Sequence, residues 1–313
     1  MSEAVDRRYP AGTRARVSTV IPTKNRKEML RQVLRALQQQ TVRSEIICVD
    51  DGSTDGTATM LRTEFPQVKM LRHEVSRGPA AARNAGAKAS NGEFLLTLDD
   101  DCILAIADAV ERTLRLFDDP DIAGVTLPFV NVRLDRRIRT AAPDAHGTFV
   151  TTDYYAGMVI LRRDAFLQAG GYREPFFMHH EEADLAIRLL NKRRFIRNGS
   201  QALIEHHESP VRDRLKLWRL GAQNAVLFAI YNVPWPWFPL HLGSTIVKTL
   251  VYAWRRGGAI PVLQGFYAAI PIAWRTLSLR TPVTGRAYLA FRTLKNGGVL
   301  PLDRLQELLG HHG

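Results

Sequence analysis

Short apolar runs rich in β-branched residues alternate with helical periodicities along the first hundred residues of the chain. In 26–40, for example, Met29, Val33, Leu34 and Leu37 repeat at the spacing of one helix face. We expect strands over 16–21, 45–49, 68–71 and 93–98 and helices over 26–40, 57–65 and 78–90. This alternation is typical of βαβ units, and it predicts an α/β fold with a parallel sheet.

Three consecutive acids, Asp99, Asp100 and Asp101, follow the strand expected at 93–98. Alternate residues of a strand point the same way, so Asp99 and Asp101 can lie on one side of the strand's exit. Ligands of α/β sheets bind beyond the carboxyl ends of the strands, and converging carboxylates there suit a hard divalent cation. The stretch therefore predicts a metal site, with a solvated acidic turn as the alternative.

Beyond residue 101 the pattern is less regular. We expect a strand over 122–127, and the polar, arginine-rich segment 131–148 predicts a mobile loop. Glu181 and Glu182 stand at the start of a later helical periodicity, where carboxylates interact favourably with the helix dipole. The second half therefore offers another pair of carboxylates, for which a charged first helical turn is the simpler explanation.

Composition narrows the function classes. The two cysteines, Cys48 and Cys102, form no CxxC or Cys/His zinc spacing, which favours a reducing compartment. The first strand is not followed by GxGxxG and the chain has no P-loop motif, which disfavours a dinucleotide oxidoreductase and a P-loop nucleotidase. Residues 1–15 contain no apolar stretch, so we expect a flexible N-terminus and no signal peptide.

The positive charge is concentrated towards the C-terminus. The formal net charge is +12, and residues 211–313 hold 13 Lys/Arg against three Asp/Glu. Within this region, 220–247 and 257–274 carry no charged side chain but contain several prolines and aromatics. Broken apolar helices beside basic residues favour an element lying in an anionic membrane interface over a spanning helix. A soluble helical cap is the alternative, and nucleic acid is not expected because no nucleic-acid module is recognisable.

Five motifs give the first 210 residues a resemblance to the family 2 glycosyltransferases. In the order and spacing of that family, they are VSTVIPTKNR (17–26), IICVDDGSTDGT (46–57), GPAAARNAGAKASNGEFLLTLDDD (78–101), GGYRE (170–174) and EEADLAIRL (181–189). The resemblance implies an α/β fold of the GT-A type, the nucleotide-diphospho-sugar transferase fold. Its sheet is Rossmann-like, mostly parallel and flanked by helices.

The same resemblance divides the chain into a catalytic domain and a C-terminal region. The catalytic domain covers 16–210, with a nucleotide-binding half at 16–101 and an acceptor half at 102–210. Residues 211–313 would form a basic, apolar helical extension that associates with a membrane.

Residues that match the family's motifs are expected to contact the donor and a metal ion. Nucleotide-sugar binding is expected of Pro22, Thr23, Asn25, Asp51, Ser53, Arg83, Asp99 and Asp100. Of these, Asp51 would accept a hydrogen bond from the base. The resemblance implies that Asp101 ligates Mg²⁺ or Mn²⁺ on the diphosphate, with Asp99, His206 or His207 as further ligands.

Glu182 falls at the position of the family's catalytic base, and Glu181 is the alternative if the helix starts differently. Asp184 and Gly157 are expected to support the site. One base and no covalent nucleophile imply a single displacement that inverts the anomeric configuration of the sugar.

The expected substrates are a nucleotide-sugar donor, UDP-linked in preference to GDP or dTDP, and a glycan or lipid-linked acceptor. With the basic region 211–313, the expected location is the cytoplasmic face of the cell membrane, as a peripheral or monotopic protein. Two other functions stay open. A sugar nucleotidyltransferase would share an Asp-rich metal site, and a basic peripheral membrane protein would use the α/β body as a scaffold only.

Overall fold

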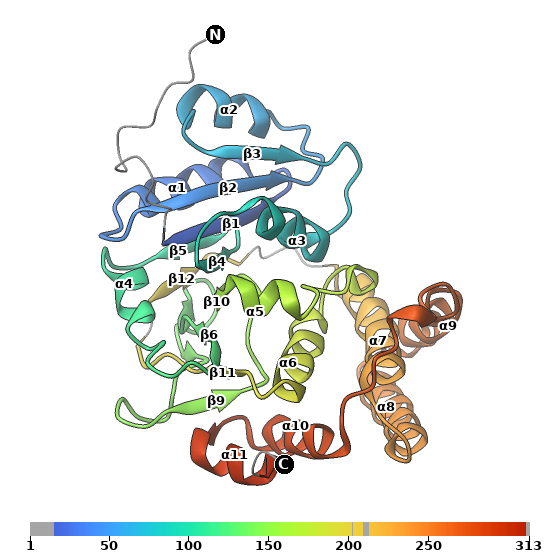
Figure 1. Ribbon diagram of the computed structural model, residues 1–313. Coiled ribbons are helices and arrows are strands. Elements are labelled where there is room, and N and C mark those ends of the chain that lie inside the picture. The colour runs from blue at the N-terminus through green and yellow to red at the C-terminus, as the bar shows by residue number, and fades with distance from the viewer. Residues whose placement is uncertain (1–15, 202, 209–212, 311–313) are drawn as a thin grey trace.

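The computed structural model describes residues 16–201, 203–208 and 213–310 (Figure 1). The first elements are β1 (Val17–Thr23), α1 (Lys27–Gln38), β2 (Ser44–Asp50), α2 (Thr57–Glu64), β3 (Lys69–Arg72), α3 (Pro79–Ala89) and β4 (Phe94–Leu98). All the strands and helices expected up to residue 98 are confirmed. The flexible N-terminus expected at 1–15 lies outside the described residues.

Shorter elements build the next part of the chain. They are β5 (Cys102–Leu104), α4 (Ala109–Leu114), β6 (Ile122–Thr126), β7 (Phe129–Asn131), β8 (Ile138–Arg139), β9 (Phe149–Thr151), β10 (Met158–Arg162), α5 (Arg163–Gln168), η1 (Glu174–Phe176), α6 (Glu181–Asn191), β11 (Phe195–Arg197) and β12 (Ile204–His206). The C-terminal region contains α7 (Arg214–Asn232), α8 (Trp237–Trp254), α9 (Ala259–Arg275), η2 (Leu277–Leu279), α10 (Gly285–Gly297), β13 (Leu300–Pro301) and α11 (Leu302–Leu309).

A nine-stranded sheet with the order β13-β9-β11-β6-β10-β4-β1-β2-β3 forms the centre of the molecule. The strands from the first hundred residues are parallel, since β1 pairs with β2 and β4 and β2 pairs with β3 in that sense. β10 runs antiparallel to both β4 and β6. The expected α/β class is therefore confirmed, and the antiparallel pairs of the second half make the sheet mixed.

Helices cover both faces of the parallel strands because β1 is apolar on both sides. Val17 and Ile21 pack in the same cluster as the buried residues of α1, and Val20 packs with the alanines of α3 on the opposite face. This follows the two-residue period of a strand. At Gly86 of α3, an added Cβ would lie 2.3 Å from Val20 Cγ1, so glycine lets α3 lie close against the sheet.

A second sheet, with the order β5-β12-β7-β8, continues from the acidic end of β4. It brings His206 opposite Cys102, the residue after Asp101. The expectation of a loop over 131–148 was wrong at one point, because β8 lies within it and pairs antiparallel with β7. Two ordered residues in a polar stretch gain their pairing from β7, a partner that local composition does not show.

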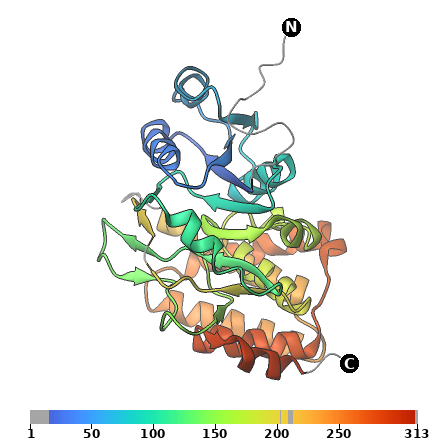
Figure 2. The ribbon, with the colours of Figure 1, turned by 60° about the vertical axis from the view of Figure 1, so that its left-hand side comes forward.

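The C-terminal region packs against the body of the protein. Helices α7, α8 and α9 stand together at one side, whereas α10 and α11 lie at the opposite end of the molecule from α2 and β3 (Figures 1 and 2). β13 pairs with β9 and so extends the nine-stranded sheet. Buried residues of α7, α10 and α11 share a core cluster with β6, β9 and β11. The domain division at residue 210 stays a prediction.

Prolines interrupt the C-terminal helices less than expected. The segment between α7 and α8 contains the expected break, near the cis Trp235–Pro236 bond. The second apolar stretch was expected to be broken, but α9 continues through Pro261 and Pro271. Pro261 stands in the first turn, where a missing N–H costs no intrahelical bond. None of the helices in the described part of the chain combines the length and the apolar character that a membrane crossing requires.

Candidate active site

A cavity of about 1100 Å³ lies at the carboxyl ends of β1, β2 and β4, and it extends to the start of α6. The predicted site residues that line it are Pro22, Thr23, Asp51, Arg83, Asp99, Asp100, Asp101, Glu181, Glu182 and His206. The predicted site residues that are not part of its lining are Asn25, Ser53, Gly157, Asp184 and His207. The carboxyl ends of parallel strands meet at one edge of a sheet, which explains why residues from separate motifs converge here.

The three acids after β4 have different partners. Asp99 accepts a hydrogen bond of 2.6 Å from Nη2 of Arg83. Asp100 is buried and accepts one of 2.8 Å from the Thr23 hydroxyl and one of 3.2 Å from Arg26. Asp101 contacts Arg26 as well.

Asp100 and Asp101 also differ in acidity. Burial raises the pKa of Asp100 to about 7, although Arg26 acts in the opposite direction. Burial also disfavours the ionised form of Asp101, but His206 and Arg26 outweigh it and lower its pKa to about 2. Asp101 is therefore the carboxylate that stays charged at neutral pH, as a metal ligand must.

Gly157 permits the position of Asp99. An added Cβ at Gly157 would lie 2.0 Å from Cγ of Asp99 and within 2.3 Å of both its carboxylate oxygens. The backbone N–H of Asp99 donates to the Gly157 carbonyl at 3.1 Å. Gly157 therefore lets the Asp99 carboxylate lie close to the backbone, which a larger residue at 157 would prevent.

Two glutamates from α6 reach the cavity from the other side. Glu181 is buried, and its Oε1 lies 3.5 Å from Nη1 of Arg83. Burial, together with the neighbouring Glu182, raises the pKa of Glu181 to about 8. Oε1 of Glu182 accepts a long hydrogen bond of 3.4 Å from the Ala156 N–H. Burial raises the pKa of Glu182 also.

Asp51 already has four donors within the chain. Oδ1 contacts Nδ1 of His73 at 2.7 Å and the Arg77 N–H at 2.9 Å, and Oδ2 accepts from the Ser76 hydroxyl at 2.6 Å and the Gly78 N–H at 2.9 Å. These contacts fix the segment from 73 to 78, which leads into α3. The contact of Asp51 with the base of a nucleotide stays a prediction.

Asn25 and Ser53 join the loops that follow β1 and β2. The Asn25 N–H donates to Oγ of Ser53 at 3.0 Å, and Oδ1 of Asn25 accepts from the Thr54 N–H at 2.7 Å. Both residues are therefore placed to shape the loops around the cavity.

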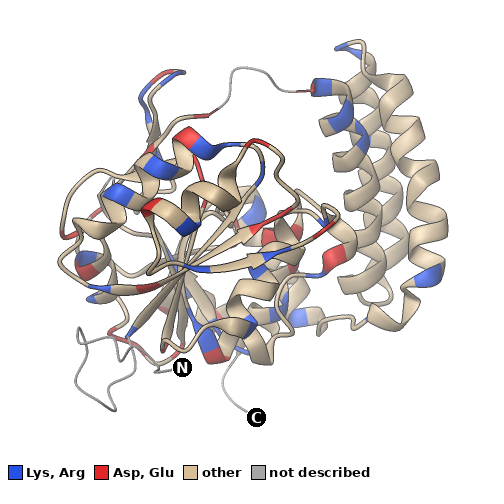
Figure 3. Ribbon diagram, turned by 90° about the horizontal axis from the view of Figure 1, so that it is seen from above, with Lys and Arg blue, Asp and Glu red and all other residues tan. Residues whose placement is uncertain are grey.

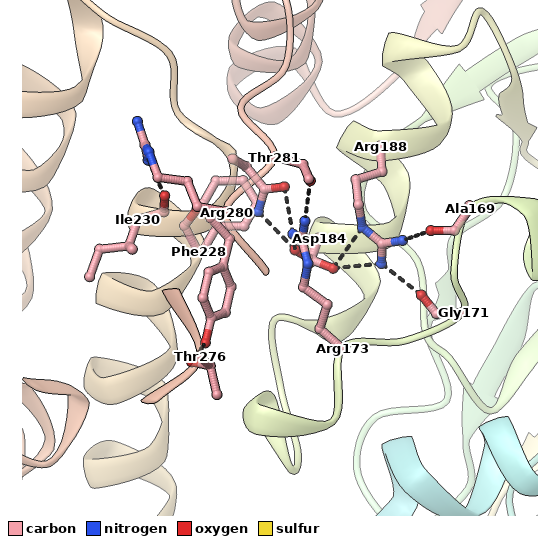
Figure 4. Close-up of polar contacts among 12 residues, drawn as sticks. Ala169, Gly171, Arg173, Asp184, Arg188, Phe228, Ile230, Thr276, Arg280 and Thr281 are labelled. Carbon is pink, nitrogen blue, oxygen red and sulfur yellow. Dashed lines mark hydrogen bonds and ion pairs between the residues drawn. The ribbon is translucent and has the colours of Figure 1, made fainter. Parts of the chain in front are cut away.

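Asp184 belongs to a buried network behind the glutamates (Figure 4). Its Oδ2 accepts hydrogen bonds from Nε and Nη2 of Arg188, at 3.0 and 2.6 Å. Its Oδ1 contacts Arg173 and accepts from Nδ2 of Asn232 at 2.8 Å. A buried carboxylate is stable only when it is paired and hydrogen-bonded in this way, so Asp184 holds α6 in place.

Asp101 and His206 fit a divalent cation. Oδ1 of Asp101 lies 3.4 Å from Nε2 of His206, and these atoms and the Cys102 sulfur lie within 4.8 Å of one another. Burial raises the pKa of the Cys102 thiol well above its usual value. Mg²⁺ and Mn²⁺ prefer oxygen and imidazole ligands to thiols, so Asp101 and His206 are the better candidates of the three. The guanidinium of Arg26 contacts the other oxygen of this carboxylate, Oδ2 of Asp101, and so already supplies it with a positive charge.

Two of the expected metal ligands do not join this group. Asp99 turns to Arg83, and Nε2 of His207 lies 3.7 Å from a carboxylate oxygen of Glu205. The His207 N–H instead donates to the backbone carbonyl of Asp101 at 2.8 Å.

Four Lys and Arg residues of the cavity lining are not among the predicted site residues: Lys24, Arg26, Lys216 and Lys295. Arg26 ends the motif VSTVIPTKNR, and its place directly after a strand end was an available signal. Lys216 and Lys295 come from α7 and α10, more than a hundred residues after Asp101. No local pattern connects them to the site.

Solved structures with similar folds extend over most of this chain. Mannosyltransferase PcManGT from Pyrobaculum calidifontis, in complex with GDP-Man and Mn²⁺, has a TM-score of 0.57 and 19% identity, covering 91% of this chain and 88% of that one. S. aureus TarS 1-349, in complex with UDP-GlcNAc, has a TM-score of 0.61 and 14% identity, covering 94% and 90%. At these identities the likeness shows the shared GT-A fold.

Sequence comparisons identify the family. A pre-mycofactocin glycosyltransferase of Mycobacterium tuberculosis is 31% identical over 228 residues, which are 66% of this chain and 46% of the relative. The chain spans about half to two thirds of the length of the curated relatives that it matches first. The family model described as Glycosyl transferase family 2 matches residues 18–173 and ends before Glu181. Through residues 18–173, the chain belongs to glycosyl transferase family 2.

Proposed function

We propose that this chain transfers a sugar from a nucleotide-diphospho-sugar to an acceptor hydroxyl, with inversion at the anomeric carbon. The observation that carries the proposal is a single cavity lined by the acids after β4 and by Glu181 and Glu182. Its volume of about 1100 Å³ exceeds the ~300–1,000 Å³ typical of small-ligand pockets, which leaves room for donor and acceptor together.

Glu182 acts as the general base. Burial and the neighbouring Glu182 raise the pKa of Glu181 to about 8 although Arg83 beside it favours the ionised form, so Glu181 carries a proton at neutral pH. Glu182 is held by one long hydrogen bond, and its raised pKa makes it a stronger base than an exposed carboxylate. It accepts the proton of the acceptor hydroxyl as that oxygen bonds to the anomeric carbon. The bond from the anomeric carbon to the diphosphate oxygen breaks, and the single displacement inverts the configuration.

The departing nucleoside diphosphate needs positive charge. Arg26, Arg83 and Lys216 line the cavity and supply part of it. When bound at Asp101 and His206, Mg²⁺ or Mn²⁺ would add Lewis-acid stabilisation of the diphosphate. The support for this cofactor is the pairing of an ionised carboxylate with a buried imidazole, in which Oδ1 of Asp101 lies 3.4 Å from Nε2 of His206.

The donor is a UDP-sugar in preference to a GDP- or dTDP-sugar. Two proteins that share the fold hold UDP-GlcNAc and GDP-Man with Mn²⁺, which supports a nucleotide sugar as the ligand class.

We place the protein at the cytoplasmic face of the cell membrane, where its acceptor would be a lipid-linked or cell-envelope glycan. Support comes from α8 and α9, which carry few charged residues (Figure 3). Their aromatic residues Trp254, Tyr267 and Trp274 are exposed to solvent over 79%, 78% and 83% of their surface. Arg255 and Arg256 stand beside them, between the two helices. Exposed aromatics next to basic residues suit the interface of an anionic leaflet.

The test combines nucleotide binding with turnover. Thermal unfolding with UDP-, GDP- and dTDP-sugars and Mn²⁺ should show a rise for one nucleotide, and Asp101→Ala should abolish that rise. Glu182→Gln should lose turnover while it still binds the nucleotide, whereas Glu307→Gln, at an exposed position of α11 outside the cavity lining, should behave as wild type. Near-normal turnover of Glu182→Gln would exclude this base, and no rise with any nucleotide would overturn the proposal.

A further inference from the structure

The loop 176–180, which leads into α6, has an unusual backbone. Phe177, His179 and His180 have positive φ angles of 58°, 70° and 69°. Side chains other than glycine keep such angles only where the surrounding structure enforces them, often at functional sites. Residues 177–180 all line the cavity, and His180 is the residue directly before Glu181 at the start of α6. The position of both glutamates therefore depends on what holds this loop.

Asn224 of α7 holds the loop from behind. Its side-chain Nδ2 donates to the backbone carbonyl of Phe176 at 2.8 Å, of Met178 at 2.7 Å and of His179 at 2.8 Å. An amide group has two hydrogens, so three carbonyls share them. Asn224 is fully buried, and without it these carbonyls would lose a donor in a place that solvent does not reach easily.

A second asparagine of α7 contacts α6 itself. Nδ2 of Asn232 donates to Asp184 at 2.8 Å, and Oδ1 of Asn232 accepts from Arg173 at 2.9 Å. Arg173 also donates to the Thr281 hydroxyl at 2.5 Å, beyond η2 (Figure 4). Asn224 and Asn232 are eight residues apart, so they lie on about the same side of α7. One helix of the C-terminal region thus holds both the loop and the helix that carry the glutamates.

We propose that Asn224 is a positioning residue for sugar transfer, which places Glu182 by holding the loop 176–180 in its strained conformation. The inference rests on the proposed function, because it assigns Glu182 the role of base. The nucleotide side of the cavity is built from other elements, with Thr23 on β1 and Asp51 after β2. Loss of Asn224 should therefore reduce catalysis much more than nucleotide binding.

The test uses two variants that remove the hydrogen-bond donor. Asn224→Ala also shortens the side chain, whereas Asn224→Leu fills a similar volume. We expect kcat for release of UDP or GDP from UDP-N-acetylglucosamine or GDP-mannose to fall about 10²-fold, as for a displacement of about 1 Å. The Kd for UDP with Mn²⁺ should stay within about twofold of wild type, because Asn224 does not contribute to the interactions that bind the nucleotide in the ground state. Hydrogen exchange of the amides at 176–184 should become at least tenfold faster. If Asn224→Ala does not fold, Asn224→Leu, which fills a similar volume without a donor, carries the test.

Tyr231→Phe is the matched control. It removes another buried side-chain hydrogen bond of α7, from Tyr231 to Thr276 at 2.5 Å, and keeps the ring that packs on Phe176. It should change neither kcat nor the exchange at 176–184. Unchanged kcat or unchanged exchange in folded Asn224 variants would overturn the inference. Wild-type protein without turnover of any nucleotide sugar would instead refute the proposed function, and the exchange measurement would still decide whether Asn224 holds the loop.

Discussion

The contact between Gly157 and Asp99 gives a prediction that can be worked from the structure. In Gly157→Ala the new methyl would lie 2.0 Å from Cγ of Asp99, a distance that no real contact tolerates. The backbone of Gly157 has no positive φ, so the whole cost comes from the clash. The Asp99 side chain must move, and its hydrogen bond of 2.6 Å to Arg83 must break.

The expected cost has two parts. Overpacking of a filled site costs roughly 1–3 kcal/mol, and a lost hydrogen bond between charged groups roughly 1.5–3 kcal/mol. The Asp99 side chain is 33% exposed, so hydrogen bonds to water offset part of the cost of the lost hydrogen bond. We expect the free energy of unfolding of Gly157→Ala to fall by about 2–4 kcal/mol.

Urea denaturation followed by tryptophan fluorescence measures this change, and a double-mutant cycle assigns it. In an Asp99→Ala background the methyl has space, so Gly157→Ala should then cost less than about 0.5 kcal/mol. Gly243→Ala is the matched control, because its Cβ would meet no atom within 4 Å in α8. That change should stabilise the protein by about 0.5–1 kcal/mol, as alanine does in helices. A Gly157→Ala protein as stable as wild type, or an equal cost in both backgrounds, would refute the reasoning.

Three other predictions concern charge and the membrane. Arg26→Gln should tighten Mn²⁺ binding about tenfold in calorimetry without nucleotide, because the guanidinium no longer competes for Asp101; unchanged affinity would contradict this. Glu181 has a folded pKa of about 8, above its unfolded value, so it stabilises the protein fully below about pH 4.5 and loses this contribution as pH rises towards 8. Glu181→Gln should flatten that decline in thermal unfolding, and an equal slope in both proteins would count against it. Trp254→Ser and Trp274→Ser should each weaken flotation with anionic vesicles about tenfold, and undiminished flotation would exclude this face.

Much of the cavity lining from the first hundred residues could be predicted from sequence. The apolar runs at 16–21, 45–49 and 93–98 identify parallel strands, and parallel strands bring their carboxyl ends to one edge. Thr23, Asp51 and the acids after β4 therefore had to lie close together. These are consequences of local periodicity and the chain order of βαβ units.

Local patterns failed wherever a partner from far along the chain decides the structure. The strand β8 inside 131–148 exists because β7 pairs with it, and the antiparallel insertion of β10 between β4 and β6 makes the sheet mixed. Neither partner can be identified from the composition of the segment itself.

The sequence by itself determined the α/β class, the edge of the sheet where the cavity lies and the residue types present there. Only the tertiary structure decided which acid meets which cation, because the partners of Asp99 and Asp101 come from α3, from the loop after β1 and from β12. It also decided that Asn224 of α7 holds the loop before Glu181. Apart from the contact between Arg83 and Asp99, which spans 16 residues, these contacts join residues more than forty positions apart. They depend on packing of the whole chain, which no local periodicity encodes.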